Sequence, residues 1–235
     1  MSPRSSRSFA WTRTLLFAAA SLAAISGCEN PGKDKAAAVV VDAQAAAAAP
    51  VPPAATPDHP AGPAQVDPAA GTRIPAVGTI GFIGAKVTQS HEGAFALHSS
   101  VFQMRDDTLA AVSIEIMVSS LKTDSAKLDG HLASPDFFDV ANIPTATFKS
   151  AEIRPGAPAD TALVGATHTA IGDLTIHGVS KHVEVPVIVE VQPDRTAART
   201  EFSIKRQDFG ITYPGKADDL IADTVVIKVD LSAIR

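Results

Sequence analysis

Residues 71 to 235 alternate apolar and polar side chains, and this pattern restricts the possible fold more than any other feature of the chain. Between residues 112 and 118, valine and isoleucine fill the even positions, with Ser113 and Glu115 between them. The segments 183–191, 200–204 and 225–231 repeat the pattern. Successive side chains of a β-strand point to opposite faces, so each segment predicts a strand with one apolar and one polar face.

Four further strands are predicted near residues 79–87, 93–101, 145–153 and 168–176. One short helix is predicted, at residues 125–132. The fold class is therefore all-β, with roughly eight strands, which suits an up-and-down antiparallel barrel whose interior holds core side chains or one small ligand. A β-sandwich remains the competing architecture, because periodicity alone cannot separate the two.

The N-terminus has the order of a secretory signal peptide. Three arginines precede a short apolar run, residues 15–25, which is shorter than the ~20 residues that a membrane-spanning helix needs. The run ends in Ile25-Ser26-Gly27-Cys28, which resembles the lipobox of bacterial lipoproteins. We therefore expect residues 1–27 to be a lipoprotein signal peptide and Cys28 to become the lipidated N-terminus. The alternative is a plain signal peptide with an incidental cysteine.

The resemblance to lipoproteins implies a location in the cell envelope. An aspartate directly after the lipidated cysteine usually retains a Gram-negative lipoprotein in the inner membrane, whereas this chain has Glu29. We therefore expect a lipid anchor on Cys28 that holds a periplasm-facing domain, with the outer membrane favoured. Cys28 is the single cysteine, which excludes an intramolecular disulfide and a cysteine zinc cluster.

Residues 28–71 have the composition of a tether. The segment is rich in alanine and proline and contains no aromatic residue, so it cannot build a core. Residues 36–49 have helix propensity but no amphipathic pattern with which to dock. We expect a disordered linker here and a single folded domain over residues 72–235.

Charge and motifs exclude several functions. A formal net charge of -5 gives no reason to expect a nucleic-acid partner. The sequence contains no nucleophile elbow, phosphate-binding loop or dinucleotide fingerprint, and the seven histidines do not have the spacing of a zinc site. We therefore expect neither an enzyme, nor a cofactor, nor a bound metal.

Three stretches carry a resemblance to a known family. They are DGHLASPDFFDVANIPTATFKSAEI at 129–153, GDLTIHGVSKHVEVPV at 172–187 and FSIKRQDFGI at 202–211. Together they make residues 72–235 similar to the YceI-like polyisoprenoid-binding family. The resemblance implies a lipocalin-like barrel that holds an isoprenoid or another long lipid-like chain in an apolar tunnel, and it allows for a homodimer.

Strand parity selects the side chains that would line such a tunnel, with two adjacent phenylalanines at one end. The candidates are Ile114, Ile116, Phe137, Phe138, Leu174, Ile176, Val185, Val187, Phe202, Ile204, Arg206, Val225 and Ile227. The charged member, Arg206, has inward parity, and a buried charge needs a partner, for which Asp208 or Asp223 is available.

Two other functions stay open at this point. In the first, side chains fill the barrel completely, and the protein has a structural or stress-response role in the envelope, acting through a protein partner. In the second, which is the least favoured, the protein is an enzyme that acts on a lipid-like substrate.

Overall fold

The computed structural model describes residue 32 and the ranges 34–41, 71–158 and 161–235. The expected signal peptide, Cys28 and most of the tether lie outside these residues. Within the described ranges, no helix is long and apolar enough to cross a membrane.

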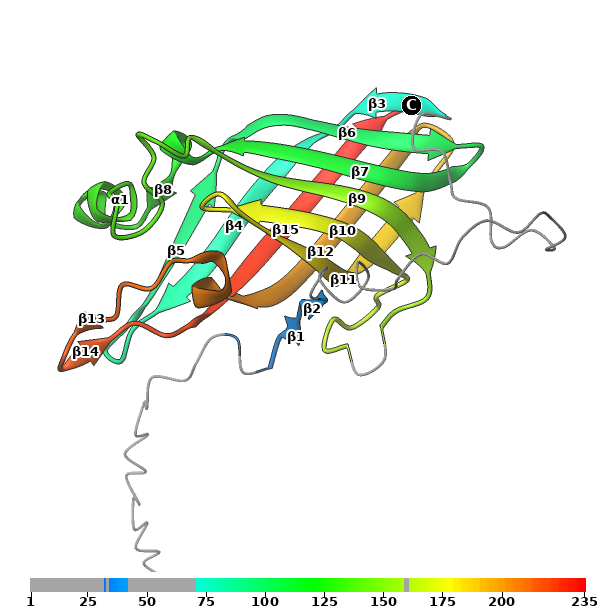
Figure 1. The fold of residues 1–235 in the computed structure, drawn as a ribbon. Helices are drawn as coiled ribbons and strands as arrows, with labels where there is room; N and C mark the ends of the chain where they lie inside the picture. Colours follow the sequence, from blue (N-terminus) through cyan, green and yellow to red (C-terminus); the bar gives the residue numbers. More distant parts are fainter. Residues whose placement is uncertain (1–31, 33, 42–70, 159–160) are drawn as a thin grey trace, which may run out of the picture.

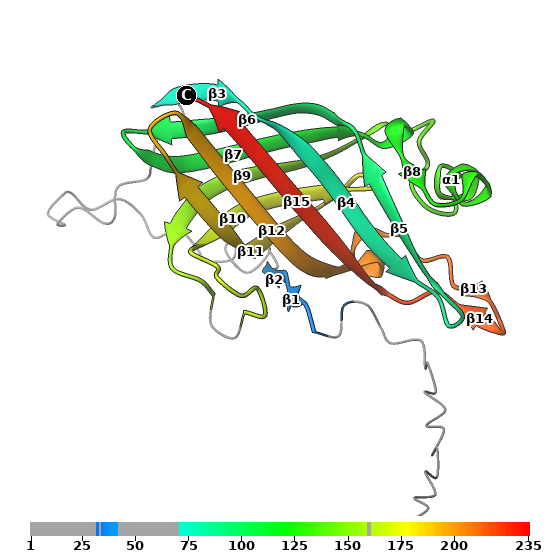
Figure 2. The ribbon, with the colours of Figure 1, turned by 180° about the vertical axis from the view of Figure 1, so that it is seen from behind.

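One large sheet, whose long strands are all antiparallel, wraps into a barrel, and β13 and β14 form a separate two-stranded sheet (Figures 1 and 2). Its main strands, in chain order, are β3 (Thr72–Pro75), β4 (Val77–Ala85), β5 (Ser90–Phe95), β6 (Leu97–Arg105), β7 (Thr108–Met117), β9 (Thr145–Pro155), β10 (His168–Ile176), β11 (Val179–Val191), β12 (Arg195–Lys205) and β15 (Thr224–Ile234). The shorter elements are β1 (Ala36–Ala37), β2 (Val39–Val41), β8 (Lys122–Thr123), β13 (Gly215–Lys216), β14 (Asp219–Leu220), the helix α1 (Ala126–Leu132) and 3-10 turns at Val118–Ser120 and Arg206–Phe209.

A bend between β3 and β4 closes the sheet into a barrel. Only Ala76 separates β3 from β4, and β3 pairs with β6 whereas β4 pairs with β15. At the bend, the Ala76 N–H donates to the Ser100 carbonyl oxygen at 2.9 Å. The strands β5 and β6 likewise form one bent stretch, interrupted only at Ala96. When each bent pair is counted once, eight long strands surround the interior, as the alternation predicts.

The local signals of the sequence explain where the strands turn. Between β10 and β11 the chain reverses in two residues, His177 and Gly178, with φ values of 51° and 73°. Positive φ at both positions is the geometry of the tight turn that matches the twist of a hairpin, and glycine adopts it without steric cost. The predicted helix is present as α1, which follows Ser125 and ends before Pro135.

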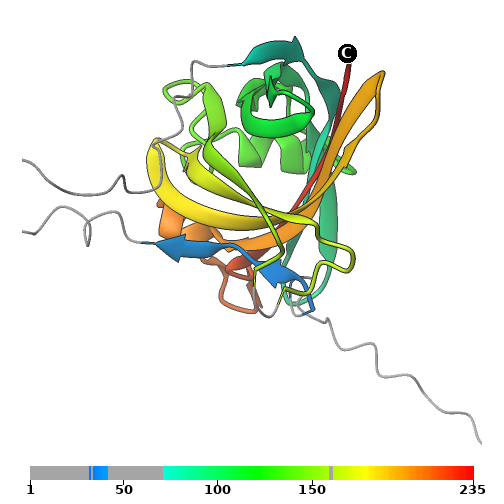
Figure 3. The same ribbon diagram turned by 90° about the vertical axis from the view of Figure 1, so that its right-hand side faces the viewer.

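Residues 36–41 are ordered on the barrel, which corrects the expectation of a disordered linker over all of 28–71. The strand β1 pairs in parallel with β12, and β2 pairs antiparallel with β11 (Figure 3). We call residues 36–41 the strap. Its alanines and valines dock as extended chain because β11 and β12 leave a gap between them, and that gap supplies unpaired backbone partners.

A proline explains why this gap exists. The strands β11 and β12 pair only from Ile188 to Val191. The Val187 carbonyl oxygen accepts a hydrogen bond from Thr167 on the β10 side, so the neighbouring residue Pro186 presents its backbone to β12. Proline has no N–H to donate, and the Pro186 carbonyl oxygen accepts from the Thr200 hydroxyl at 2.6 Å instead. The ladder between the two strands therefore stops at this point.

Candidate ligand-binding cavity

The barrel encloses an apolar space of about 170 Å³, which we call the inner chamber. Side chains of β4, β5, β7, β9, β10, β11, β12 and β15 line it, and its few polar members are Thr147, Thr200 and Arg206. An engineered cavity of ~150 Å³ with a similar lining stays dry and binds benzene. The inner chamber can therefore hold a ring-sized piece of hydrocarbon without any polar partner.

The structure brings nearly all of the predicted lining residues together. Those that line the inner chamber are Ile114, Ile116, Phe138, Leu174, Ile176, Val185, Val187, Phe202, Ile204, Arg206, Val225 and Ile227. Phe137, the remaining candidate, does not reach this space and lies in a neighbouring one. Whether these side chains contact a ligand stays a prediction.

A second space of about 470 Å³, the outer chamber, lies at one end of the barrel. Its walls come from α1, from the chain after β12 and from the ends of β4 and β5, and Figure 1 shows α1, β13 and β14 gathered at that end. Leu128, Leu132, Phe137 and Tyr213 give it an apolar side. It also has several charged lining residues, which include Lys86, Lys127, Lys216 and Asp219, whereas Arg206 is the one charged residue in the lining of the inner chamber.

The two chambers meet at a ring of shared side chains, which we call the throat. The residues that line both spaces are Phe82, Phe138, Arg206, Ile211 and Val225. A molecule that occupies both chambers therefore lies against these side chains. Together the chambers reach the range of ~300–1,000 Å³ that is typical of small-molecule pockets.

Arg206 is the charged member of the throat, and it is 5% exposed. Its guanidinium group donates to three backbone carbonyl oxygens, those of Ile211 at 2.6 Å, Ala222 at 3.1 Å and Ile221 at 3.3 Å. These bonds fasten the chain after β12 across the end of the barrel. Burial lowers the pKa of Arg206, and the charge of nearby Asp223 opposes that shift.

The predicted ion pair of Arg206 is wrong. Neither Asp208 nor Asp223 forms a salt bridge with it among the described residues, and the Asp223 carboxylate accepts from the Gln207 N–H at 3.0 Å instead. The reason is geometric, because backbone carbonyl oxygens of the 211–222 segment already accept the hydrogen bonds that the guanidinium group donates. Within the part of the chain that the structure describes, the throat consequently carries a positive charge that no carboxylate neutralises by direct contact.

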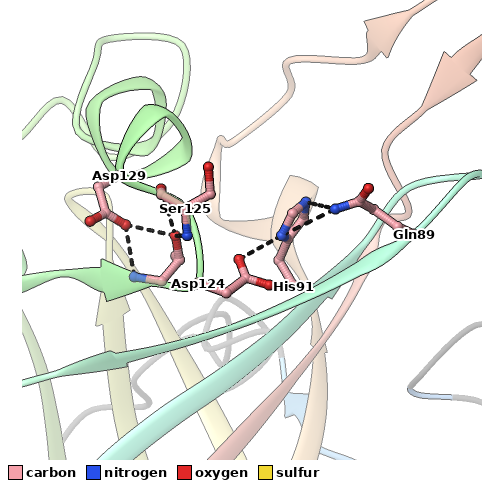
Figure 4. Close-up of polar contacts among 6 residues, drawn as sticks. Gln89, His91, Asp124, Ser125 and Asp129 are labelled. Atoms are coloured by element: carbon pink, nitrogen blue, oxygen red, sulfur yellow. Dashed lines mark hydrogen bonds and ion pairs between the residues drawn. The ribbon is translucent and has the colours of Figure 1, made fainter.

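Polar contacts hold α1 in place as a wall of the outer chamber (Figure 4). His91 Nδ1 on β5 lies 2.7 Å from Asp124 Oδ1, and Gln89 Nε2 lies 2.7 Å from the other ring nitrogen of His91. Within the helix segment, the Asp129 carboxylate accepts from both the hydroxyl and the N–H of Thr123, each at 2.7 Å. The hydroxyl bond is the largest cause of a lowered pKa at Asp129.

Two further groups complete the outer chamber. The rings of His131, Phe137 and Tyr213 pack together with centroid distances of 5.0 to 5.4 Å. On the opposite wall, Asp219 pairs with Lys86 and also accepts from the Thr88 hydroxyl at 3.0 Å. The Lys86 hydrogen bond is the main cause that lowers the pKa of Asp219 below 3.8, with desolvation opposing it.

His91 and His131 take part in this packing. Among the described residues, no three side chains of the metal-ligating types gather into a group that could hold an ion. His59 lies outside the described residues.

Several lining residues were missed by the parity argument. Ile80, Phe82 and Phe148 lie on strands that the alternation predicts, so parity could have found them. Phe209 and Ile211 follow the end of β12, where the period of two is lost, and no local signal identifies them. The outer chamber was missed for the same reason, because loops and a helix build it.

Comparison with known proteins supports the fold. The family model described as the YceI-like domain matches residues 71–233, close to the predicted domain of 72–235. A UPF0312 protein of Pseudomonas fluorescens (strain SBW25) is 27% identical over 182 residues, which are 71% of this chain and 88% of that protein. A UPF0312 protein of Pseudomonas aeruginosa (strain LESB58) is 33% identical over 119 residues, and the match spans only 58% of its length.

Two solved structures are similar. The crystal structure of BcnA from Burkholderia cenocepacia aligns with a TM-score of 0.56 at 29% identity, covering 66% of this chain and 95% of that one. A polyisoprenoid binding domain from Saccharophagus degradans aligns with a TM-score of 0.50 at 18% identity, covering 69% of this chain and 98% of that domain. Because the identity to the Saccharophagus degradans domain is only 18%, this similarity supports the fold alone.

Proposed function

Because the chain belongs to the YceI-like family, we propose that its barrel binds a polyisoprenoid or another long-chain lipid-like molecule, as a non-enzymatic lipoprotein of the cell envelope. The observation that carries this proposal is the inner chamber, an apolar space within the barrel that shares the side chains of the throat with a larger, partly charged chamber. A barrel filled by its own side chains, the alternative role, would not need such a space.

The two chambers suit the two ends of an amphipathic lipid. Each Å² of apolar surface removed from water contributes about 25 cal/mol, so a hydrocarbon chain in the inner chamber needs few polar anchors. A chain longer than a ring-sized fragment has to continue through the throat. Its polar end then lies in the outer chamber, near Lys127 and Lys216 and close to the buried charge of Arg206.

The anchoring part of the proposal rests on the sequence of the N-terminus. With Cys28 lipidated, the barrel is held at a membrane that supplies or receives its ligand. Several acyl chains at ~0.8 kcal/mol per buried methylene make such attachment firm.

The test combines lipid extraction with a variant that fills the chamber. Full-length protein purified from membranes is extracted with organic solvent, and the extract is analysed by mass spectrometry; we expect one recurrent lipid class near stoichiometric amount. Ala198 lines the inner chamber, and the Ala198→Phe ring should occupy the space of the ligand. The matched control is Ala111→Phe on β7, because Ala111 is not among the lining residues.

We expect Ala198→Phe to lose the lipid and Ala111→Phe to retain it. An empty extract from the wild-type protein, or equal lipid in both variants, would argue against the proposed function and favour a barrel filled by side chains. Conversion of an added lipid to a product would favour the enzyme.

A further inference from the structure

The strap closes a break in the barrel wall beside the inner chamber. Because the β11–β12 ladder covers only residues 188–191 of β11, the two strands form no backbone ladder over residues 179–187 of β11 and 200–205 of β12. In this gap, Ala36 and Ala37 pair with β12, and Val39 to Val41 pair with β11. The Ala38 N–H donates to the Ser203 carbonyl oxygen at 2.8 Å, so the strap bonds to both sides of the break.

The strap packs against the wall of the inner chamber itself. Ala38 and Val40 contact the hydrophobic cluster that contains Val185, Phe202 and Ile204. These three side chains also line the inner chamber. One layer of side chains therefore lies between the strap and the ligand space.

The strap is held more weakly than the strands that it joins. It contributes ladders of two and three residue pairs, whereas β12 and β15 pair over eleven. Its side chains are only alanine and valine. Directly before the strap, Lys35 Nζ forms an ion pair with Glu201 Oε1 of β12 at 2.7 Å. Segments with few buried contacts open locally at far lower free energy than the whole domain unfolds.

We propose that the strap is a side gate: it stays attached to β12, where Lys35 pairs with Glu201, and its release from β11 opens the seam between β11 and β12 so that a lipid chain enters or leaves the inner chamber sideways. This inference rests on the proposed function of the chamber. It also gives the tether a role beyond spacing. From Cys28 to Ala36 the chain reaches at most about 29 Å even when fully extended, so a lipidated Cys28 keeps the gate close to the membrane surface.

The experiment locks the gate with a disulfide. Val39 and Glu184 are register partners, and Val39 is 53% exposed, so the double variant Val39→Cys/Glu184→Cys places two thiols on the outer side of the seam. A Cys28→Ser background makes them the only thiols, because the chain has one cysteine. The matched control is Thr175→Cys/Ser180→Cys, another register pair, whose hydroxyl oxygens lie 2.7 Å apart on the β10–β11 hairpin.

The readout is the rate at which the full-length protein, after removal of detergent, releases dansyl-labelled undecanoate into phosphatidylcholine vesicles. We expect oxidation to slow release from the locked variant about tenfold or more, since local opening then no longer sets the rate, and reduction to restore it. Oxidation of the control pair should change nothing. Replacing residues 36–41 by alternating glycine and serine should speed release.

The outcomes separate the two proposals. If the probe binds but leaves the oxidised and reduced locked forms at equal rates, the side gate is refuted and exchange runs through the outer chamber. If no form binds the probe and no native lipid copurifies, the proposed function itself fails, and the gate fails with it. Because the locked variant adds no cavity, its result stands even where the glycine-serine variant does not fold.

Discussion

The Phe202→Ala variant tests whether the interior is a ligand tunnel or an ordinary core. Phe202 is 5% exposed on β12, and its ring lines the inner chamber. The matched control is Phe102→Ala: Phe102 on β6 is 0% exposed and belongs to the largest core cluster, but it does not line the chamber. The two variants remove the same atoms from two different surroundings.

The expected magnitudes differ because the lost contacts differ. Deleting a phenyl ring from a packed core costs about 3–5 kcal/mol, as a transfer term and a cavity term together. Phe102 has neighbours on all sides, so its variant should lose about 4–5 kcal/mol of unfolding free energy. One side of Phe202 already borders about 170 Å³ of open space and makes no contacts there. We therefore expect Phe202→Ala to cost about 2–3 kcal/mol in the stripped protein.

The assay is urea unfolding of delipidated protein, followed by circular dichroism, with copurified lipid quantified before stripping. Phe202→Ala should lower the lipid content clearly, whereas Phe102→Ala should leave it near the wild-type level in the folded fraction. Equal losses of stability in the two variants, with unchanged lipid in Phe202→Ala, would show that Phe202 is packing and that the tunnel is lined by other residues.

Three further predictions concern the backbone, acid stability and the anchor. Gly172→Ala should destabilise the domain by at least ~1–3 kcal/mol, because the added Cβ would lie 2.2 Å from a backbone oxygen of β9, whereas Gly130→Ala in α1 meets nothing within 4 Å and should gain ~0.5–1 kcal/mol; thermal melts of both compare them. Since Lys86 lowers the folded pKa of Asp219 below 3.8, that carboxylate stabilises the fold fully above this value and progressively less as the pH falls below it. Asp219→Asn should therefore flatten the acid limb of a stability-against-pH curve, and an unchanged limb would contradict the assignment. Cys28→Ser should abolish labelling by a fatty-acid analogue, and equal labelling of both proteins would disprove the lipid anchor.

The barrel could be predicted from the sequence because its determinants are local. A period of two in residues 112–118 or 183–191 is enough to specify a strand and its inward face. The His177-Gly178 pair marks a hairpin for steric reasons that operate within two residues. All eleven candidates that were chosen by parity line the inner chamber because parity, once a strand is known, decides direction, and Phe138, chosen as an end residue, joins them.

The strap and the outer chamber depend on partners distant in the chain. Residues 36–41 are three alanines followed by three valines, with no alternation, and in isolation alanine favours a helix. They are extended where they pair with β11 and β12, two strands far along the chain that form no ladder with each other beyond Ile188. Arg206 illustrates the same limit: its inward direction follows from parity, but its carbonyl partners lie on a segment whose path no local pattern specifies.

The bend at Ala76 affects the order in which the barrel folds during synthesis. Residues 72–75 pair with β6 and residues 77–83 pair with β15, the last strand of the domain. Strand pairs this distant in sequence form slowly, because a long loop must close before they contribute. Until the C-terminal strand arrives, β4 and β12 each present an unpaired edge to which a neighbouring molecule can add. A newly made chain is therefore most prone to aggregate just before its final eleven-residue strand takes its place.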